Sequence, residues 1–481
     1  MRAAIGIDVG TSAVKALAVS EDGEVLARRE VAYPLSTPRP GWSEQNPDDW
    51  WKATKEALDG LADEVVGIGL SGQMHGLVTL DDADEVIRPA ILWNDQRTAA
   101  ECVEIEERVG FDRLVELTGN RALTGFTAPK LLWLRRHEPD AYARVARVLL
   151  PKDYVRLRLT GEWAIDASDA SGTLLLDVGR RAWSDEVLAA LDLPAAWFPP
   201  LLESPQQAGE VDASCRLLQG TPVAAGAGDQ SAAAVGVGAV RPDVLSVVLG
   251  TSGVVLAPLP AYAHDPAGRV HAFCHAVPDA WQAMGVMLSA ARSLAWFHDQ
   301  LAPDVPFDGL VAEAGGWEPG AGGLLFLPYL AGERTPHADP DARGAFAGLE
   351  LRHDRGALVR AVLEGVAFGL RDCLDVLRPL GVRGTAARVS GGGARGRLWL
   401  GIVASALDLP LELTASEEGS AFGAALLGGV AGGVFDDVDD AVARCVRVTA
   451  VVEPDPAWRD AYADLLPRYR ALYPALRGPA A

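Results

Sequence analysis

Residues 5–19 read I-G-I-D-V-G-T-S-A-V-K-A-L-A-V, and residues 245–258 repeat the pattern as L-S-V-V-L-G-T-S-G-V-V-L-A-P. In each stretch a triplet, Gly10-Thr11-Ser12 or Gly250-Thr251-Ser252, separates two runs of apolar and β-branched residues, which is typical of a β-hairpin. A Gly-Thr-Ser turn offers consecutive backbone N–H groups and two hydroxyls, and such a concavity suits a phosphate oxygen. One turn in each half indicates two lobes that close on one polyphosphate. The alternative is two unrelated hairpins that share a triplet.

Composition narrows the class of protein. A chain of 481 residues is long enough for two domains. The net charge of −22 argues against a nucleic-acid partner, which would require concentrated Lys and Arg. The five cysteines lack C-x-x-C spacing and fit reduced thiols, so we expect a cytoplasmic protein. The N-terminus has no signal-peptide pattern, and the most apolar stretches do not predict a membrane span.

Strands and helices alternate in both halves of the sequence. The boundary between the halves is expected near Arg241-Pro242-Asp243, which gives domains of residues 1–241 and 242–481. Alternation in two related halves predicts an α/β protein with a mixed sheet in each lobe. Beyond the hairpins, strands are expected at 65–71, 77–80, 223–227, 281–287 and 386–390, and helices after Asn46, over much of 98–160, at 289–301, 354–378 and 397–407, and through 431–481.

Asp8 precedes the first Gly-Thr-Ser turn. A carboxylate beside a phosphate loop is repulsive unless a divalent cation lies between them, so Asp8 is predicted to contact Mg²⁺. The alternative is an Asx residue that forms the turn. The second hairpin has Leu249 at the place equivalent to Asp8, so an acid is not needed to make the turn.

Asp229 lies between Gly228 and Gln230, before a run of small residues that could begin a helix. It has two interpretations, which can coexist. In the first, Asp229 is a general base that removes a proton from a hydroxyl as it attacks phosphorus. In the second, it caps the helix N-terminus.

Residues 72–76, G-Q-M-H-G, form a second candidate site after a strand. Gln73, Met74 and His75 offer a polar donor, an apolar contact and an imidazole, which suits a polyol with one apolar edge. A structural role is the alternative for a lone histidine. Trp93, with Asn94 and Asp95 after it, could supply an aromatic wall and two polar groups.

Residues 390–396, S-G-G-G-A-R-G, satisfy G-x-G-x-x-G between a strand and a helix. Fewer than 90 residues follow, too few for a full dinucleotide-binding fold. Gly391, Gly392 and Gly393 are therefore predicted to approach the adenosine of a nucleotide. The alternative interpretation, an NAD-dependent oxidoreductase, depends on this motif match alone.

Together these motifs closely resemble the FGGY carbohydrate kinases, members of the actin/Hsp70/hexokinase-like (ribonuclease H-like) superfamily. The resemblance runs from about residue 4 to about residue 430, and residues 125–137 and 417–425 look like the two family signatures. The stretches W-S-E-Q-N-P, G-Q-M-H-G, A-I-L-W-N-D-Q-R, L-L-P-K-D-Y-V-R-L-R-L-T-G and L-A-G-E-R-T-P-H are most similar to family members that act on D-xylulose.

The resemblance implies two duplicated α/β domains around a central cleft, with ATP and Mg²⁺ as cosubstrate and metal. It implies transfer of a phosphoryl group to the 5-hydroxyl of D-xylulose, and a homodimer as an oligomeric state. Gln230 stands where relatives acting on D-xylulose often have Asn, so ribulose or glycerol are alternative substrates. From a different class, an actin- or Hsp70-like ATPase switch is the competing function. The implied residues are Asp229 as catalytic base, Gln73, Met74, His75, Trp93, Asp229 and Gln230 on the sugar, Asp8 and Asp229 at the metal, and Gly10, Thr11, Ser12, Lys15, Gly250, Thr251, Ser252, Gly391, Gly392 and Gly393 on the nucleotide.

Overall fold

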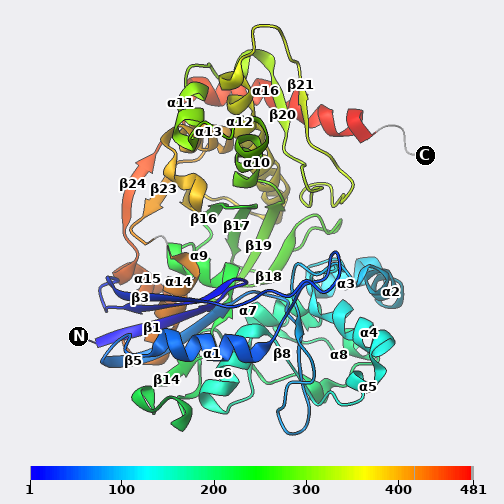
Figure 1. Ribbon diagram of the computed structural model, residues 1–481, viewed down its shortest axis with the longest axis vertical. Coiled ribbons are helices and arrows are strands. Elements are labelled where there is room, and N and C mark those ends of the chain that lie inside the picture. Colours follow the sequence, from blue (N-terminus) through cyan, green and yellow to red (C-terminus); the bar gives the residue numbers. More distant parts are fainter. Residues whose placement is uncertain (1, 417, 478–481) are drawn as a thin grey trace.

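The computed structural model describes residues 2–416 and 418–477. The chain forms two stacked lobes, one built mainly from the first half of the sequence and one mainly from the second (Figure 1). Glu417, within the second signature, lies outside the described residues. Each lobe is organised around one mixed β-sheet.

The first sheet has the strand order β13-β14-β5-β1-β2-β3, and a short strand β15 also pairs with β5. Strands β1 and β5 are parallel, as are β14 and β5, whereas β1–β2, β2–β3 and β13–β14 are antiparallel. The strands are β1 (Arg2–Val9), β2 (Ala13–Val19), β3 (Val25–Ala32), β5 (Glu64–Gly72), β13 (Gln207–Glu210), β14 (Pro222–Ala224) and β15 (Ala227–Gly228).

The second sheet repeats this arrangement, with the order β18-β19-β17-β16-β22-β23-β24. Here β16 and β22 are parallel, as are β22 and β23, and the remaining neighbours are antiparallel. The sequence prediction of two duplicated mixed sheets is confirmed. The strands are β16 (Val244–Leu249), β17 (Gly253–Leu259), β18 (His271–Cys274), β19 (Trp281–Met287), β22 (Ala386–Ser390), β23 (Leu411–Thr414) and β24 (Val448–Val452).

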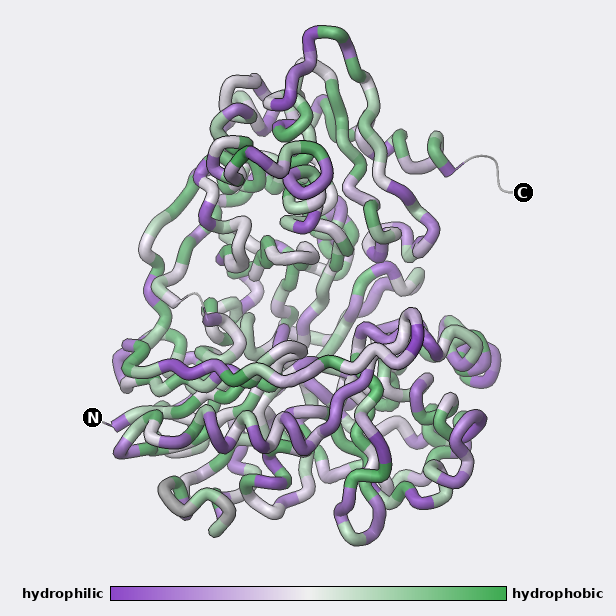
Figure 2. The backbone as a smooth tube through the Cα atoms, viewed as in Figure 1, coloured by the Kyte–Doolittle hydropathy of each residue, from purple (hydrophilic) through white to green (hydrophobic). Residues whose placement is uncertain are grey.

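Helices and short strands cover the two sheets. Around α1, buried Trp50, Trp51 and Ala57 face the first sheet's core, and Figure 2 shows hydrophobic and hydrophilic positions alternating along this helix. The helices are α1 (Pro47–Leu58), α2 (Ala99–Val109), α3 (Phe111–Thr118), α4 (Thr127–His137), α5 (Pro139–Tyr142), α6 (Pro151–Thr160), α7 (Ala167–Ala170), α8 (Asp185–Ala190), α9 (Asp229–Val237), α10 (Ala291–Leu301), α11 (Phe307–Ala314), α12 (Arg355–Leu377), α13 (Arg397–Leu407), α14 (Gly419–Ala431), α15 (Val438–Cys445) and α16 (Pro456–Arg477). The short strands are β4 (Glu44–Gln45), β6 (Val78–Leu80), β7 (Ala90–Ile91), β8 (Arg147–Leu149), β9 (Ile165–Asp166), β10 (Leu176–Asp177), β11 (Ala182–Trp183), β12 (Leu201–Leu202), β20 (Leu325–Leu327) and β21 (Ala345–Ala347).

One expectation about secondary structure needs correction. The sequence predicts helix for residues 431–481, but β24 adds an antiparallel edge strand at residues 448–452. The β-branched residues Val448, Thr449, Val451 and Val452 are compatible with a strand, and pairing with β23 decides it. The prediction that 98–160 is mainly helical is confirmed, and the short strand β8 within this stretch pairs with β6.

Helix α14 belongs to the second half of the chain but packs on the first sheet. A Cβ atom at Gly6 on β1 would lie 1.9 Å from the carbonyl oxygen of Ala421 on α14, so the two backbones are in direct contact. Ile5, Ile7 and Val9 point to the opposite face of β1, into the core that contains α1. Because side chains alternate along a strand, Asp8 shares the Gly6 face.

Candidate functional site

The carboxyl end of β1 presents Asp8. It lies directly opposite Ser71 on the parallel strand β5, and Ser71 Oγ donates a hydrogen bond of 2.8 Å to Asp8 Oδ1. Burial raises the pKa of Asp8, although Ser71 and the ammonium of Lys15 oppose the increase. Asp8 is therefore a desolvated carboxylate that a nearby cation would stabilise.

The equivalence of Asp8 and Leu249 was wrong by one position. Counted from the glycine of each turn, Val9 corresponds to Leu249 and Asp8 corresponds to Val248. The strand register agrees, since Asp8 is opposite Ser71 and Val248 is opposite Ser390. The two hairpins still differ in charge at this position, because Val248, like Leu249, is uncharged.

The first Gly-Thr-Ser turn connects with two other predicted site segments. The Gly10 N–H donates to the Ala13 carbonyl at 3.1 Å, which closes the turn. Thr11 Oγ1 accepts a 3.0 Å hydrogen bond from Trp93 Nε1 and donates at 3.3 Å to Gln73 Oε1. Trp93 keeps 44% of its surface exposed. The turn, the G-Q-M-H-G loop and Trp93 are therefore brought together.

Asp229 is the first residue of α9, directly after β15. Gly228 occupies the N-cap position and Asp229 is the first residue of the helix, so the interpretation of Asp229 as the cap was wrong. Gln230 Nε2 lies 3.3 Å from Asp229 Oδ1. Burial, and then the negative charge of Asp8, raise the pKa of Asp229 to about 7. The two predicted carboxylates are thus close enough to influence each other's charge.

The Gly72–Gly76 loop lies beside Asp229. A Cβ atom at Gly228 would lie 2.9 Å from Met74 Cγ, so Met74 packs against the backbone that carries Asp229. Met74 is only 4% exposed. The Gln73 amide already has protein partners: Nε2 donates to the Gly10 carbonyl and to Gln45 Oε1, at 3.3 and 3.0 Å. Of the loop's side chains, His75 has the most available polar chemistry.

His75 has one nitrogen engaged and one available. Its Nδ1 lies 2.6 Å from the Gly172 carbonyl, which can only accept, so Nδ1 carries the proton. Burial, with smaller effects from Lys130 and Arg334, lowers the pKa of His75 to about 3. The ring is therefore neutral at physiological pH. Nε2 has no hydrogen-bond partner within the described chain, and it can accept a hydrogen bond from a ligand hydroxyl.

The second Gly-Thr-Ser turn lies against the predicted adenosine loop. Gly391 has φ +92°, and a Cβ atom there would lie 3.0 Å from the Gly250 nitrogen. A cavity of about 540 Å³ opens beside this loop, lined by Gly391 and Gly392, by Lys15 from β2, and by Glu418. Lys15 Nζ lies 3.4 Å from Glu418 Oε2. This cavity therefore brings together predicted nucleotide residues from both lobes.

A second cavity, of about 610 Å³, lies between residues of the two halves of the chain. Trp93, Asn94 and Arg121 line it from the first half, and His271, Glu333 and Arg334 from the second. Sequence reasoning assigned no role to the last three. The stretch L-A-G-E-R-T-P-H contains two of them, but neither its spacing nor its composition indicates which site it joins.

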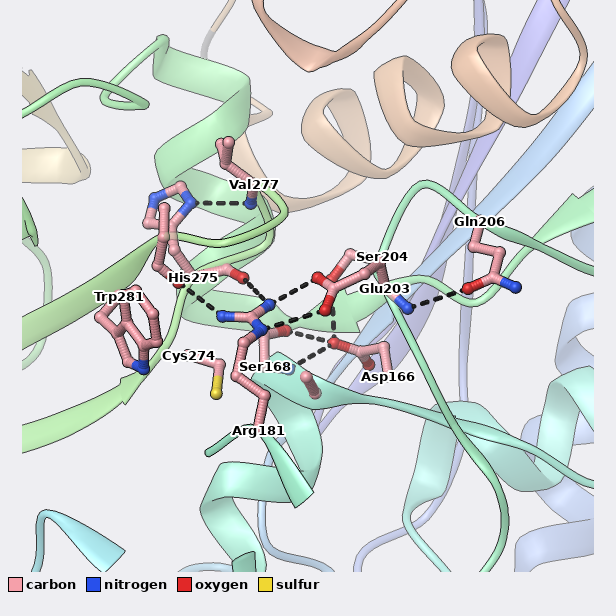
Figure 3. A network of polar contacts seen from close by, with 12 residues as sticks. Asp166, Ser168, Arg181, Glu203, Ser204, Gln206, Cys274, His275, Val277 and Trp281 are labelled. Atoms are coloured by element: carbon pink, nitrogen blue, oxygen red, sulfur yellow. Dashed lines mark hydrogen bonds and ion pairs between the residues drawn. The ribbon is translucent and has the colours of Figure 1, made fainter. Parts of the chain in front are cut away.

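A buried charge cluster under the site was also missed. Lys152 Nζ lies 2.6 Å from Asp153 Oδ1 and 2.7 Å from Asp166 Oδ1, and all three side chains are fully buried. Asp166 Oδ2 accepts from the backbone N–H of Ser168 at 2.8 Å, and Ser168 Oγ accepts from Gly228 N–H at 3.3 Å. The cluster is thus connected to the residue preceding Asp229. Figure 3 shows Asp166 and Ser168 within this network.

The donors at the site fit a magnesium–nucleotide complex. Within residues 2–416 and 418–477, no three or more His, Cys, Asp or Glu side chains converge as a metal site. Asp8 and Asp229 form a pair of carboxylates whose protonation is favoured by burial and, at Asp229, by the charge of Asp8. Mg²⁺ is commonly bound by one or two carboxylates together with waters and substrate phosphates. The pair therefore suits Mg²⁺ that arrives with a nucleotide.

None of the described helices is long and apolar enough to cross a membrane.

Two stacked mixed sheets, with phosphate-type turns and paired carboxylates between them, define a phosphoryl-transfer enzyme of the actin/hexokinase-like fold. Models of the FGGY family of carbohydrate kinases match the chain, the N-terminal domain over residues 3–236 and the C-terminal domain over residues 245–432. The chain therefore belongs to the FGGY family of carbohydrate kinases.

Similar proteins extend over nearly the whole chain. A xylulose kinase from Escherichia coli (strain K12) is 45% identical over 437 residues, covering 89% of this chain and 90% of that protein. A xylulose kinase from Bacillus subtilis (strain 168) is 40% identical and covers 98% of this chain and 97% of its own length. The crystal structure of a xyloylose kinase from Brucella ovis superposes with a TM-score of 0.93 at 44% identity, covering 99% of both chains.

Proposed function

We propose that the protein transfers the γ-phosphoryl group of ATP to the 5-hydroxyl of D-xylulose. The observation that carries this proposal is the similarity to proteins named xylulose kinase, at 40 and 45% identity over 98 and 89% of this chain. The arrangement of Asp8, Asp229 and His75 supports it, because a metal-side carboxylate, a base and a polyol-binding group lie around one site.

Asp229 acts as the general base. As the sugar O5 attacks the γ-phosphorus, its proton passes to the Asp229 carboxylate, the new O5–P bond forms, and the bond from phosphorus to the β,γ-bridging oxygen breaks to release ADP. A pKa of about 7 suits this task, because the carboxylate is available near neutral pH and is basic enough to take the proton.

The remaining residues bind and orient the reactants. Backbone N–H groups of the two Gly-Thr-Ser turns hold phosphate oxygens, and the Gly391–Gly393 loop accommodates the adenosine. Asp8 and Asp229 would hold Mg²⁺ that arrives with the nucleotide, and the bound ion would supply neutralisation of the charge that develops on the phosphate oxygens. His75 Nε2 accepts a hydrogen bond from a sugar hydroxyl, and Trp93 supplies an aromatic wall to the cavity of about 610 Å³.

A substrate panel tests the proposal. ADP release is measured with D-xylulose, D-ribulose, L-ribulose and glycerol, and without any acceptor. We expect D-xylulose to give the highest kcat/KM. A preference for another polyol would reassign the substrate within the family. ATP turnover that no sugar stimulates would instead favour a nucleotide-driven switch.

A further inference from the structure

The loop that carries Arg334 belongs to the second lobe but is fixed to a hairpin, β18–β19. Thr335 N–H donates to the Val286 carbonyl at 2.9 Å, and Val286 N–H donates to Thr335 Oγ1 at 3.1 Å. Glu333 Oε1 accepts from the backbone N–H groups of Leu288 and Arg334, at 2.9 and 2.7 Å. These bonds hold the loop against the end of β19.

The same hairpin is fastened to the first lobe. At its base, Asn120 Nδ2 donates to the Ala272 carbonyl at 3.0 Å, and farther along, Cys274 N–H donates to Ser171 Oγ at 3.0 Å. At its tip, Arg181 Nη1 donates to the Ala280 carbonyl at 2.6 Å, and Figure 3 shows Arg181 lying beside His275 and Trp281. The hairpin, and the loop it holds, are therefore positioned by the lobe that contains His75.

A hydrogen-bond relay orients the Arg334 side chain. His271 Nδ1 lies 2.7 Å from Asn120 Oδ1, so it carries the proton and Nε2 is the acceptor. Arg334 Nη1 lies 3.3 Å from this Nε2. The other guanidinium N–H groups have no hydrogen-bond partner in the part of the chain that the structure describes. They are available to a ligand in the cavity that Arg334 lines.

The end of the cavity near Arg334 also contains a buried group without a partner. Glu333 Oε2 makes no hydrogen bond with any described residue, and Glu333 is only 2% exposed. A ligand hydroxyl that donates to Glu333 Oε2 would satisfy this group, because buried polar groups are costly when they remain unpaired.

Arg334 lies near enough to His75 for its charge to contribute to lowering the pKa of that ring. The His75 ring is 6.2 Å from the Phe273 ring, and Phe273 stacks on His271 at 5.6 Å, so the Phe273 ring lies between His75 and His271, the partner of Arg334. On the other side of His75, the neighbouring residue Met74 packs against Gly228, which precedes Asp229. Asp229, Met74, His75 and Arg334 thus follow one another along the site.

We propose that Arg334 determines specificity by donating a hydrogen bond to the C2 carbonyl oxygen of the ketose, while His75 Nε2 accepts the neighbouring C1 hydroxyl. This inference rests on the proposed function, which places the 5-hydroxyl at Asp229 and so directs the ketone end away from it. A guanidinium can donate but never accept. A ketone oxygen only accepts hydrogen bonds and therefore suits the Arg334 guanidinium. The proton of an alditol hydroxyl at C2 needs an acceptor, which the guanidinium is not.

The experiment compares D-xylulose with its two C2-reduced forms, xylitol and D-arabitol. Arg334→Gln is expected to lower kcat/KM for D-xylulose by about 10- to 100-fold while changing that for the alditols by less than about threefold, since the ketone oxygen can only accept and so depends most on the charged donor. Arg334→Lys keeps one donor and should retain part of the preference. Dissociation constants for D-xylulose and xylitol, measured by calorimetry without ATP, should show the same pattern.

Arg269→Gln is the matched control. Arg269 lines the same cavity, but its guanidinium is held by Asp265 at 2.6 Å, so the ketose preference should be unchanged. Equal losses for ketose and alditols in Arg334→Gln, or no loss, would overturn the inference. If Arg334→Gln does not fold, an unchanged preference in Arg334→Lys overturns it. Wild-type enzyme that does not respond to D-xylulose would contradict the proposed function instead, and this outcome is separable from the others.

Discussion

Ser71 donates a 2.8 Å hydrogen bond to Asp8, and at the same register of the second sheet Ser390 lies opposite the uncharged Val248. The two sheets therefore place a serine at corresponding points, but only the first places a carboxylate beside it. This difference is why the proposed mechanism assigns the metal side of the site to the first lobe.

Replacing Asp8 should impair the use of Mg²⁺. In Asp8→Ala we expect the apparent affinity for Mg²⁺, measured from turnover at fixed ATP, to fall by about tenfold or more, because one of two carboxylate ligands is lost. An unchanged Mg²⁺ response in Asp8→Ala would exclude Asp8 from the metal site.

Replacing Asp229 should remove the base but spare the fold. Asp229→Asn is expected to lower kcat by about two to four orders of magnitude, the usual range for a lost general base, while D-xylulose binding measured by calorimetry persists. Near-normal turnover in this variant would show that another group takes the proton.

The pH dependence of kcat/KM should report on Asp229. Its raised pKa, about 7, means that the carboxylate is protonated in acid, so activity should fall about tenfold per pH unit below 7. Saturating Mg²⁺ and ATP should move this limb to lower pH, since a cation favours the ionised form. An acid limb whose position does not depend on Mg²⁺ would argue against a shared carboxylate pair.

His275 should make stability sensitive to acid. Val277 N–H donates to its Nδ1 at 3.0 Å, its Nε2 lies 3.2 Å from the Ala239 carbonyl, and burial lowers its pKa to about 4. The unfolded chain takes up this proton below pH 6.5 whereas the folded protein does not, so stability falls as pH decreases from 6.5 to about 4.

The contribution is measurable by chemical denaturation of wild type and His275→Gln at pH 7.5 and 5. The free energy of unfolding of the wild type should lose about 2 kcal/mol more than that of the variant over this interval. Equal losses in both proteins would show that His275 titrates normally in the folded state.

The contact between β1 and α14 should not tolerate even one methyl group. Gly6→Ala places a Cβ atom against the Ala421 carbonyl and should lower the free energy of unfolding by about 1–3 kcal/mol or more. Gly401→Ala, on α13, meets only Trp458 at 3.6 Å and should be neutral or stabilising. The midpoints of thermal unfolding compare the two, and similar midpoints would contradict the close packing.

Local patterns predicted much of the fold and the candidate nucleotide residues. The two hairpins around Gly-Thr-Ser and the strand at 386–390 follow from short-range alternation and turn chemistry, and the structure has them at those positions. The capping interpretation of Asp229 failed because the chain enters α9 one residue earlier than the sequence suggests.

Residues whose roles depend on distant packing could not be predicted. Arg334 reaches its cavity only because β18–β19 is fastened to Asn120 and Arg181, far away in the sequence. Lys152 pairs with Asp153, Asp166 and Asp169 because α6 packs beside the segment that leads into α7. The periodicity of the sequence does not predict this packing.

The position of α14 has a consequence for how the chain can be divided. Ala4, Leu17 and Val19 of the first sheet are buried against Phe422 and Leu426 of α14, so residues 1–241 alone would expose an apolar sheet face. Separately expressed halves should therefore aggregate or remain incompletely folded, and recover activity only when they are produced together. A recombination event at residue 241 would join β1 and α14 from different parents. Such a chimaera would keep its fold only if both parents preserve the backbone contact between Gly6 and Ala421.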